Sequence, residues 1–155
     1  MYTTWNLVLF AVAWLAVPAL RPFALFSSVL IALVVESTMV VDHRDVFGVY
    51  ARTCGVDSIA GGVAVDLTVH VLPAVLAVAM WAHEASASAS PSASPVFVAS
   101  AFAAPAVLGA YMWVVDVDGV YFPTGRVDGG ATTLRTSLCV AAAYVAVAAV
   151  ILREV

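Results

Sequence analysis

The stretch SIAGGVAVDLTVHVLPAVLAVAMWA (Ser58–Ala82) is apolar along most of its length, yet it holds Asp66 and His70 near its middle. An α-helix needs about 20 predominantly apolar residues to cross the hydrocarbon core of a bilayer, and this stretch is long enough. Ionisable side chains in such a helix are costly, so they are either functional or packed against another helix. The stretch therefore bears on both the fold class and the candidate site.

The composition of the whole chain indicates the same class of protein. Of the 155 residues, 64% are hydrophobic and 10% are charged, and the mean hydropathy is +1.06. Soluble domains carry about 25% charged residues. Helices that are apolar on all sides belong in a bilayer or at the centre of a large assembly. The sequence thus predicts an all-α, polytopic transmembrane helical bundle, with residues 1–155 forming a single transmembrane domain.

Apolar stretches divide the chain into about five predicted spans, with a polar connection at 42–57 and another at 116–132. Residues 83–95 (HEASASASPSASP) offer no apolar face and predict a flexible Ser/Ala linker. An alternative of four spans makes the first two stretches a re-entrant hairpin. The predicted spans are residues 5–20, 23–41, 58–82, 96–115 and 133–152.

The arginines predict the orientation. With five spans, Arg44, Arg52, Arg126 and Arg135 lie on the side of the amino terminus, and Arg21 and Arg153 lie on the other side. The positive-inside rule then places the amino terminus on the cytoplasmic side.

The two cysteines, Cys54 and Cys139, also map to the side of the amino terminus. They are expected to be thiols if that compartment is reducing, and a disulfide would indicate an oxidising one.

Asp66 and His70 are four residues apart, so they share one face of a helix. Gly62 and Pro73 fall on the same face and predict close packing there against another helix. Glu36 lies about 7 Å from the end of its span, and Asp66 about 13 Å from the same side, at 1.5 Å per residue. Asp66, His70 and Glu36 are therefore candidates for one site.

Three interpretations of this site remain open. In the favoured one, Asp66 and His70 satisfy each other and fix helix packing. In the second, Asp66, His70 and Glu36 relay protons or ions. In the third they bind a metal, but one histidine with two acids is a weak ligand set, and we expect no metal.

Other features predict packing and membrane contacts. Ala101, Pro105 and Gly109 recur every four residues and form a small-residue stripe suited to close helix contact. Tyr50 suits the aromatic belt at a membrane interface. The stretch DVDGVYFPTGRVD (116–128) superficially resembles a calcium loop, but its glycine comes too early and no glutamate follows at the twelfth position.

Several classes of function are disfavoured. A net charge of −4 without a basic run argues against nucleic-acid binding. Motifs of serine hydrolases, zinc proteases and nucleotide-binding enzymes are absent from the sequence, and no cofactor is expected.

We expect a non-catalytic protein that contacts membrane lipid and forms a homo-oligomer or joins a larger complex, in a respiratory, photosynthetic or virion membrane. The first alternative is an oligomeric proton or ion channel or transporter. The second is an intramembrane hydrolase or transferase with His70 as its base.

Overall fold

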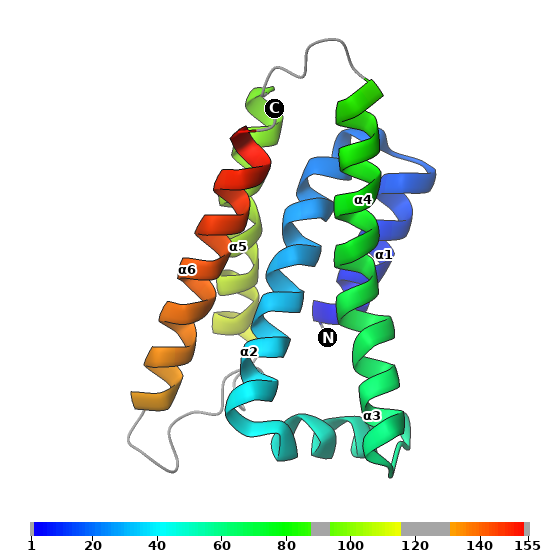
Figure 1. Cartoon of the computed structure of the whole chain (residues 1–155), viewed down its shortest axis with the longest axis vertical. Helices are drawn as coiled ribbons and strands as arrows, with labels where there is room; N and C mark the ends of the chain where they lie inside the picture. Colours follow the sequence, from blue (N-terminus) through cyan, green and yellow to red (C-terminus); the bar gives the residue numbers. More distant parts are fainter. Residues whose placement is uncertain (1, 88–93, 116–130, 154–155) are drawn as a thin grey trace.

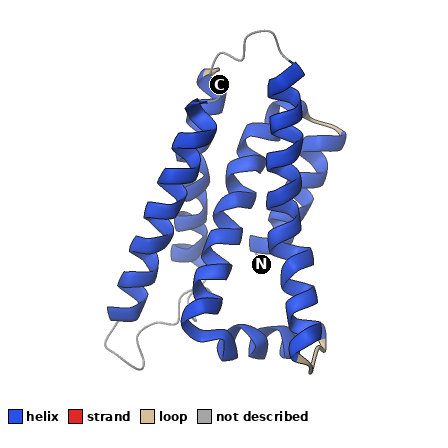
Figure 2. Cartoon of the chain, viewed as in Figure 1, coloured by secondary structure: helices blue, strands red, loops and turns tan. Residues whose placement is uncertain are grey.

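The computed structural model describes residues 2–87, 94–115 and 131–153, and every element in these ranges is a helix (Figure 1; Figure 2). This confirms the all-α class. The elements are α1 (Tyr2–Leu15), the 3-10 helix η1 (Pro18–Leu20), α2 (Arg21–Cys54), α3 (Ile59–Asp66), the π-helix η2 (Leu67–Val71), α4 (Leu72–Ala87), α5 (Pro95–Val115) and α6 (Ala131–Arg153).

Helix α2 is the centre of the bundle. It packs against α1 and α4 on one side and against α5 and α6 on the other (Figure 1). Phe26 of α2 is fully buried and meets Phe97 of α5 and Tyr144 of α6 edge to face, with ring centroids 5.4 and 6.5 Å apart. Such edge contacts are the preferred aromatic geometry. The core therefore forms around α2, and the other long helices cover it.

The predicted polar connection at 42–57 lies between the two candidate spans, and it is helical as far as Cys54 because α2 continues through this region. The C-terminal part of α2 turns away from the bundle axis and runs across the lower end of the bundle (Figure 1). Gly55 ends the helix at a φ of 66°, a left-handed conformation that glycine adopts without steric cost. Ser58 begins α3 by accepting a 3.0 Å hydrogen bond from the Gly61 N–H.

Two helical stretches are long and apolar enough to cross a membrane, namely Pro18–Val40 and Ile59–Ser86. They correspond to the predicted spans 23–41 and 58–82. Shorter apolar helices at Thr3–Leu15, Pro95–Tyr111 and Ser137–Arg153 occupy the remaining predicted spans.

Two predicted boundaries need correction. The span 5–20 is divided, because α1 ends at Leu15 and a 3-10 turn precedes α2, with Pro18 at its first position. The linker 83–95 begins too early, because residues 83–87 are the last turn of α4. The rest of that linker up to residue 93, and the calcium-like stretch together with most of the connection at 116–132, lie outside the described residues.

The predicted stripe on α5 is only partly buried. Ala101 is buried together with Phe97, Ala104 and Leu108, whereas Pro105 is half-buried and Gly109 is exposed. A Cβ atom built at Gly109 meets nothing within 4 Å. The side of α5 that packs within this chain is thus rotated away from the predicted one, and Gly109 faces outward.

Candidate functional site

Asp66 and His70 are in direct contact in the interior of the bundle. Asp66 Oδ1 lies 2.9 Å from His70 Nδ1, and the two residues are 4% and 5% exposed. A buried carboxylate costs several kcal/mol unless hydrogen bonds satisfy it. The other hydrogen-bond partners of Asp66 therefore determine how well its buried carboxylate is stabilised.

The backbone around His70 is locally widened. Residues Leu67–Val71 form a π-helix, and the Leu72 N–H donates to the Leu67 carbonyl, five residues back. Pro73 has no N–H, so the Val69 carbonyl loses its usual α-helical partner, and the proline ring crowds that carbonyl. Single π turns inside α-helices are frequent at functional sites. Pro73, which is buried, thus provides a local cause for the widening at His70.

Tyr50 joins the pair from α2. Its hydroxyl donates a 2.6 Å hydrogen bond to Asp66 Oδ1 and lies 3.2 Å from His70 Nδ1, and its ring stacks on the imidazole with centroids 6.1 Å apart. Burial, together with the charge of Asp66, raises the pKa of Tyr50 above its ordinary value. The prediction that Tyr50 belongs to an aromatic belt is wrong, because the side chain is buried against Asp66.

Thr3 approaches His70 from α1, with Oγ1 3.2 Å from the imidazole Nε2. A carboxylate has only acceptor atoms, so the Asp66 contact requires the hydrogen of a neutral His70 ring to be on Nδ1. Nε2 then accepts a hydrogen bond from the Thr3 hydroxyl. Thr3, His70 and Asp66 are thereby aligned in series.

Glu36, on α2, lies close enough to Asp66 for the two carboxyl groups to interact electrostatically. The Glu36 side chain is exposed, so it lies at the outer edge of the cluster.

The bend of α2 makes this convergence possible. Glu36 and Tyr50 are 14 residues apart, which is about 21 Å along a straight helix at 1.5 Å per residue. Tyr50 nevertheless bonds the carboxylate of Asp66, and Glu36 lies close enough to interact with it electrostatically. A straight α2 could not deliver both residues to one carboxylate.

A second buried polar contact lies one turn further along α1. Asn6 Nδ2 donates to Ser28 Oγ at 3.2 Å, and Asn6 Oδ1 is buried without a partner among the described residues. Beyond Ser28, towards the start of α2, the core consists of Ala24, Leu25 and Phe26 along with Ser27. The polar contacts from Asp66 to Thr3 and the separate contact from Asn6 to Ser28 therefore end partway through the bundle.

The sequence predicts one site of Asp66, His70 and Glu36, and the structure brings Asp66 and His70 into contact, with Glu36 near Asp66. The sequence prediction missed Tyr50 and Thr3. A continuous helix through 42–54 would have placed Tyr50 near α3, but the sequence predicts only a polar connection there. No local signal marks Thr3, whose role comes only from the packing of α1 against η2.

Gly62 is buried, as its place on the Asp66 face suggested, and its neighbour is Phe47. A Cβ atom at Gly62 would lie 2.4 Å from Phe47 Cδ1. Within the described residues, no group of three His, Cys, Asp or Glu side chains is placed to hold a metal ion.

Comparisons of this chain with protein-family models, with curated proteins and with solved structures find no match. The assignment of a function therefore depends on the physical arguments above.

Proposed function

We propose that this chain is a multi-pass membrane protein without catalytic activity of its own, which assembles with copies of itself or with larger membrane-protein partners. In this proposal the five apolar helical segments cross the membrane, and the amino terminus lies on the cytoplasmic side. The cluster of Thr3, Tyr50, Asp66 and His70, called here the Asp66 cluster, holds α1, α2 and η2 together inside the bundle. Lipid and partner helices cover its outer surface.

The observation that carries this proposal is the apolar outer surface of α5 and α6. Phe102 is 71% exposed and Val145 is 65% exposed, and Leu138 and Val150 are exposed to a similar extent. Exposing apolar area to water costs about 25 cal/mol per Å². Such faces are stable against lipid chains or against another helix.

Small residues on the same outer surface favour helix partners. Gly109, Ala106 and Ala110 of α5 are exposed, as are Ala142 and Ala146 of α6. In a bilayer, helices associate through close backbone approach, which small side chains allow. We therefore assign the predicted stripe through Gly109 to contacts between chains.

The test is the native mass of the protein after gentle detergent extraction from its source membrane, with co-purifying chains identified. We expect a homo-oligomer or a stoichiometric complex. Gly109→Ile should reduce that mass to a monomer while circular dichroism shows unchanged helicity, because the position is open within the chain. Gly109→Ala is the matched control and should keep the assembly. A wild-type monomer, or an aqueous protein that alkaline carbonate washes from membranes, would contradict the proposal.

A proton relay is the second candidate, and the contacts from Asp66 through His70 to Thr3 favour it. They provide a carboxylate, an imidazole and a hydroxyl in series, with the exposed carboxyl group of Glu36 near Asp66. Because these contacts end at Thr3, a complete path would need a second chain. Asp66→Asn should abolish proton flux into vesicles if the relay operates, with folding and assembly retained. Unchanged flux in that variant, or no flux in the wild type, excludes the relay.

In the hydrolase hypothesis, the base His70 has a hydroxyl group beside it, that of Thr3. Thr3, His70 and Asp66 follow the order of nucleophile, base and orienting carboxylate. Catalysis also requires a substrate groove and donors for a developing oxyanion, so this hypothesis stays third. A fluorophosphonate probe should leave the protein unlabelled. Labelling that disappears in Thr3→Val would instead make the protein a hydrolase.

A further inference from the structure

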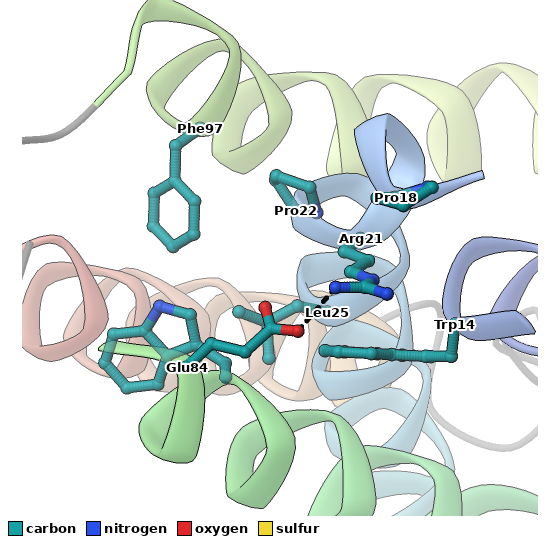
Figure 3. Close-up of a pocket in the computed structure, with 8 residues that line it drawn as sticks. Trp14, Pro18, Arg21, Pro22, Leu25, Glu84 and Phe97 are labelled. Atoms are coloured by element: carbon teal, nitrogen blue, oxygen red, sulfur yellow. Dashed lines mark hydrogen bonds and ion pairs between the residues drawn. The ribbon is translucent and has the colours of Figure 1, made fainter. Parts of the chain in front are cut away.

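A cavity of about 300 Å³ lies between the end of α1, the start of α2, the last turns of α4 and the start of α5 (Figure 3). It is remote from the Asp66 cluster, towards the opposite end of the bundle. It combines one cation, one anion and aromatic walls, and its lining includes Trp14, Arg21, Leu25, Trp81, Glu84 and Phe97.

Arg21 and Glu84 form an ion pair at the wall of this cavity, with Nη1 2.5 Å from Oε1 and side chains 29% and 47% exposed. Arg21 Nε also donates to the Ala13 carbonyl at 3.3 Å, and the guanidinium lies 5.0 Å from the centre of the Trp14 ring. These two hydrogen bonds use two of the five guanidinium N–H donors. Exposed ion pairs contribute at most about 1 kcal/mol, so a ligand with matching charges can compete for both partners.

Trp14 supplies an independent sign of a ligand. Its indole Nε1 is buried and has no hydrogen-bond partner among the described residues. A buried donor without an acceptor is costly, and native structures rarely leave one unmatched. An acceptor group on a ligand bound beside Trp14 is one way to satisfy this indole N–H.

The remaining walls are apolar or aromatic. The rings of Trp81 and Phe97 stack with centroids 6.4 Å apart, and Leu25 is almost fully buried. Aromatic faces attract quaternary and primary ammonium groups. The cavity thus has donors for an anion and, around Glu84 and the aromatic rings, an environment for a cation.

Both charged residues lie at the ends of candidate spans. Arg21 is close to the start of Pro18–Val40, and Glu84 is close to the end of Ile59–Ser86. Tryptophan is enriched at this depth, where lipid headgroups lie. We propose that the cavity binds the headgroup of a zwitterionic phospholipid, with its phosphate on Arg21 and its ammonium on Glu84. This rests on the membrane location in the proposed function.

The experiment measures lipid binding to the purified full chain in detergent by native mass spectrometry, with phosphatidylcholine and phosphatidylglycerol as probes. We expect phosphatidylcholine to bind at least tenfold more tightly than phosphatidylglycerol. Arg21→Gln should weaken phosphatidylcholine binding about tenfold. Arg153→Gln, which removes an exposed arginine at the end of α6, is the control and should bind like the wild type.

A second variant protects the test against misfolding. Glu84→Gln removes the anion that repels acidic headgroups, so it should narrow or reverse the preference for phosphatidylcholine over phosphatidylglycerol. Misfolding would weaken the binding of phosphatidylcholine without strengthening that of phosphatidylglycerol, whereas removal of the Glu84 charge should strengthen the binding of phosphatidylglycerol. Free glycerophosphocholine should compete only weakly if the acyl chains contribute, and full competition would mean that the cavity takes the soluble headgroup alone and not the lipid.

The proposal is overturned if Arg21→Gln and Glu84→Gln bind both lipids as the wild type does. It is also overturned if Arg153→Gln loses as much binding as Arg21→Gln, because binding would then reflect general surface charge. Carbonate extraction separates this failure from failure of the proposed function. A wild type that stays in the membrane while the variants bind normally contradicts the lipid site alone.

Discussion

The hydroxyl of Tyr144 on α6 donates a 2.6 Å hydrogen bond to the carbonyl oxygen of Ala101 on α5. Pro105 lies four residues after Ala101 inside α5 and has no N–H, so this carbonyl lacks its usual helical partner. The side chain of one helix therefore satisfies a backbone acceptor that proline has released in another. Both Tyr144 and Ala101 are buried, and the bond fixes the position of α6 relative to α5.

Tyr144→Phe should destabilise the fold by about 1 kcal/mol, because the Ala101 carbonyl then remains buried without a donor. In a Pro105→Ala background the same change should cost less, since residue 105 would supply an N–H to that carbonyl. Unfolding titrations with sodium dodecyl sulfate, followed by circular dichroism, measure the stability of the wild type, the two single variants and the double variant of this cycle. Equal costs in both backgrounds would show that the released carbonyl is unimportant.

Gly62→Ala should destabilise the protein by about 1–2 kcal/mol, because the new methyl group overlaps the ring of Phe47. Gly109→Ala is the matched control, since its methyl group enters open space and should stabilise the helix by up to about 1 kcal/mol. Phe47→Leu should recover part of the loss in the Gly62→Ala background. Similar stabilities for the two alanine variants, measured by the same titration, would contradict the packing of Phe47 on Gly62.

Cys54 and a cysteine introduced at Ser86 should lie on opposite sides of the membrane, because the candidate span Ile59–Ser86 separates them. Both positions are exposed. A membrane-impermeant maleimide added to sealed vesicles, in a Cys139→Ala background, should label one of the two cysteines, and permeabilisation should expose the other. Labelling of both before permeabilisation would show that the segment does not cross.

The stability of the protein should fall at alkaline pH through Tyr50. Its pKa is raised in the folded state above the ordinary value of 10, so above pH 10 the unfolded chain has released a proton that the folded chain still holds. The free energy of unfolding then decreases with rising pH, by up to about 1.4 kcal/mol per unit for this group. Below pH 10 the contribution is fully present.

Tyr50→Phe should remove this component of the pH dependence and should also lower stability at neutral pH, since Asp66 loses a donor. Unfolding titrations between pH 8 and 12 on both proteins, a range of roughly two units either side of the ordinary tyrosine value, provide the comparison. An identical slope in the variant would mean that Tyr50 ionises as freely in the folded protein as in the unfolded chain.

Hydropathy and helical spacing by themselves determined the all-helical class, the two long apolar helices and the pairing of Asp66 with His70, because these are local properties of one stretch of chain. Only the tertiary structure decided that α2 continues and bends, so that Glu36 and Tyr50, 14 residues apart, both lie close to Asp66. It alone also decided that Thr3 meets His70 and that Gly109 faces outward. These relationships depend on how whole helices pack, and packing depends on the summed contacts of residues far apart in the sequence, which no local pattern contains.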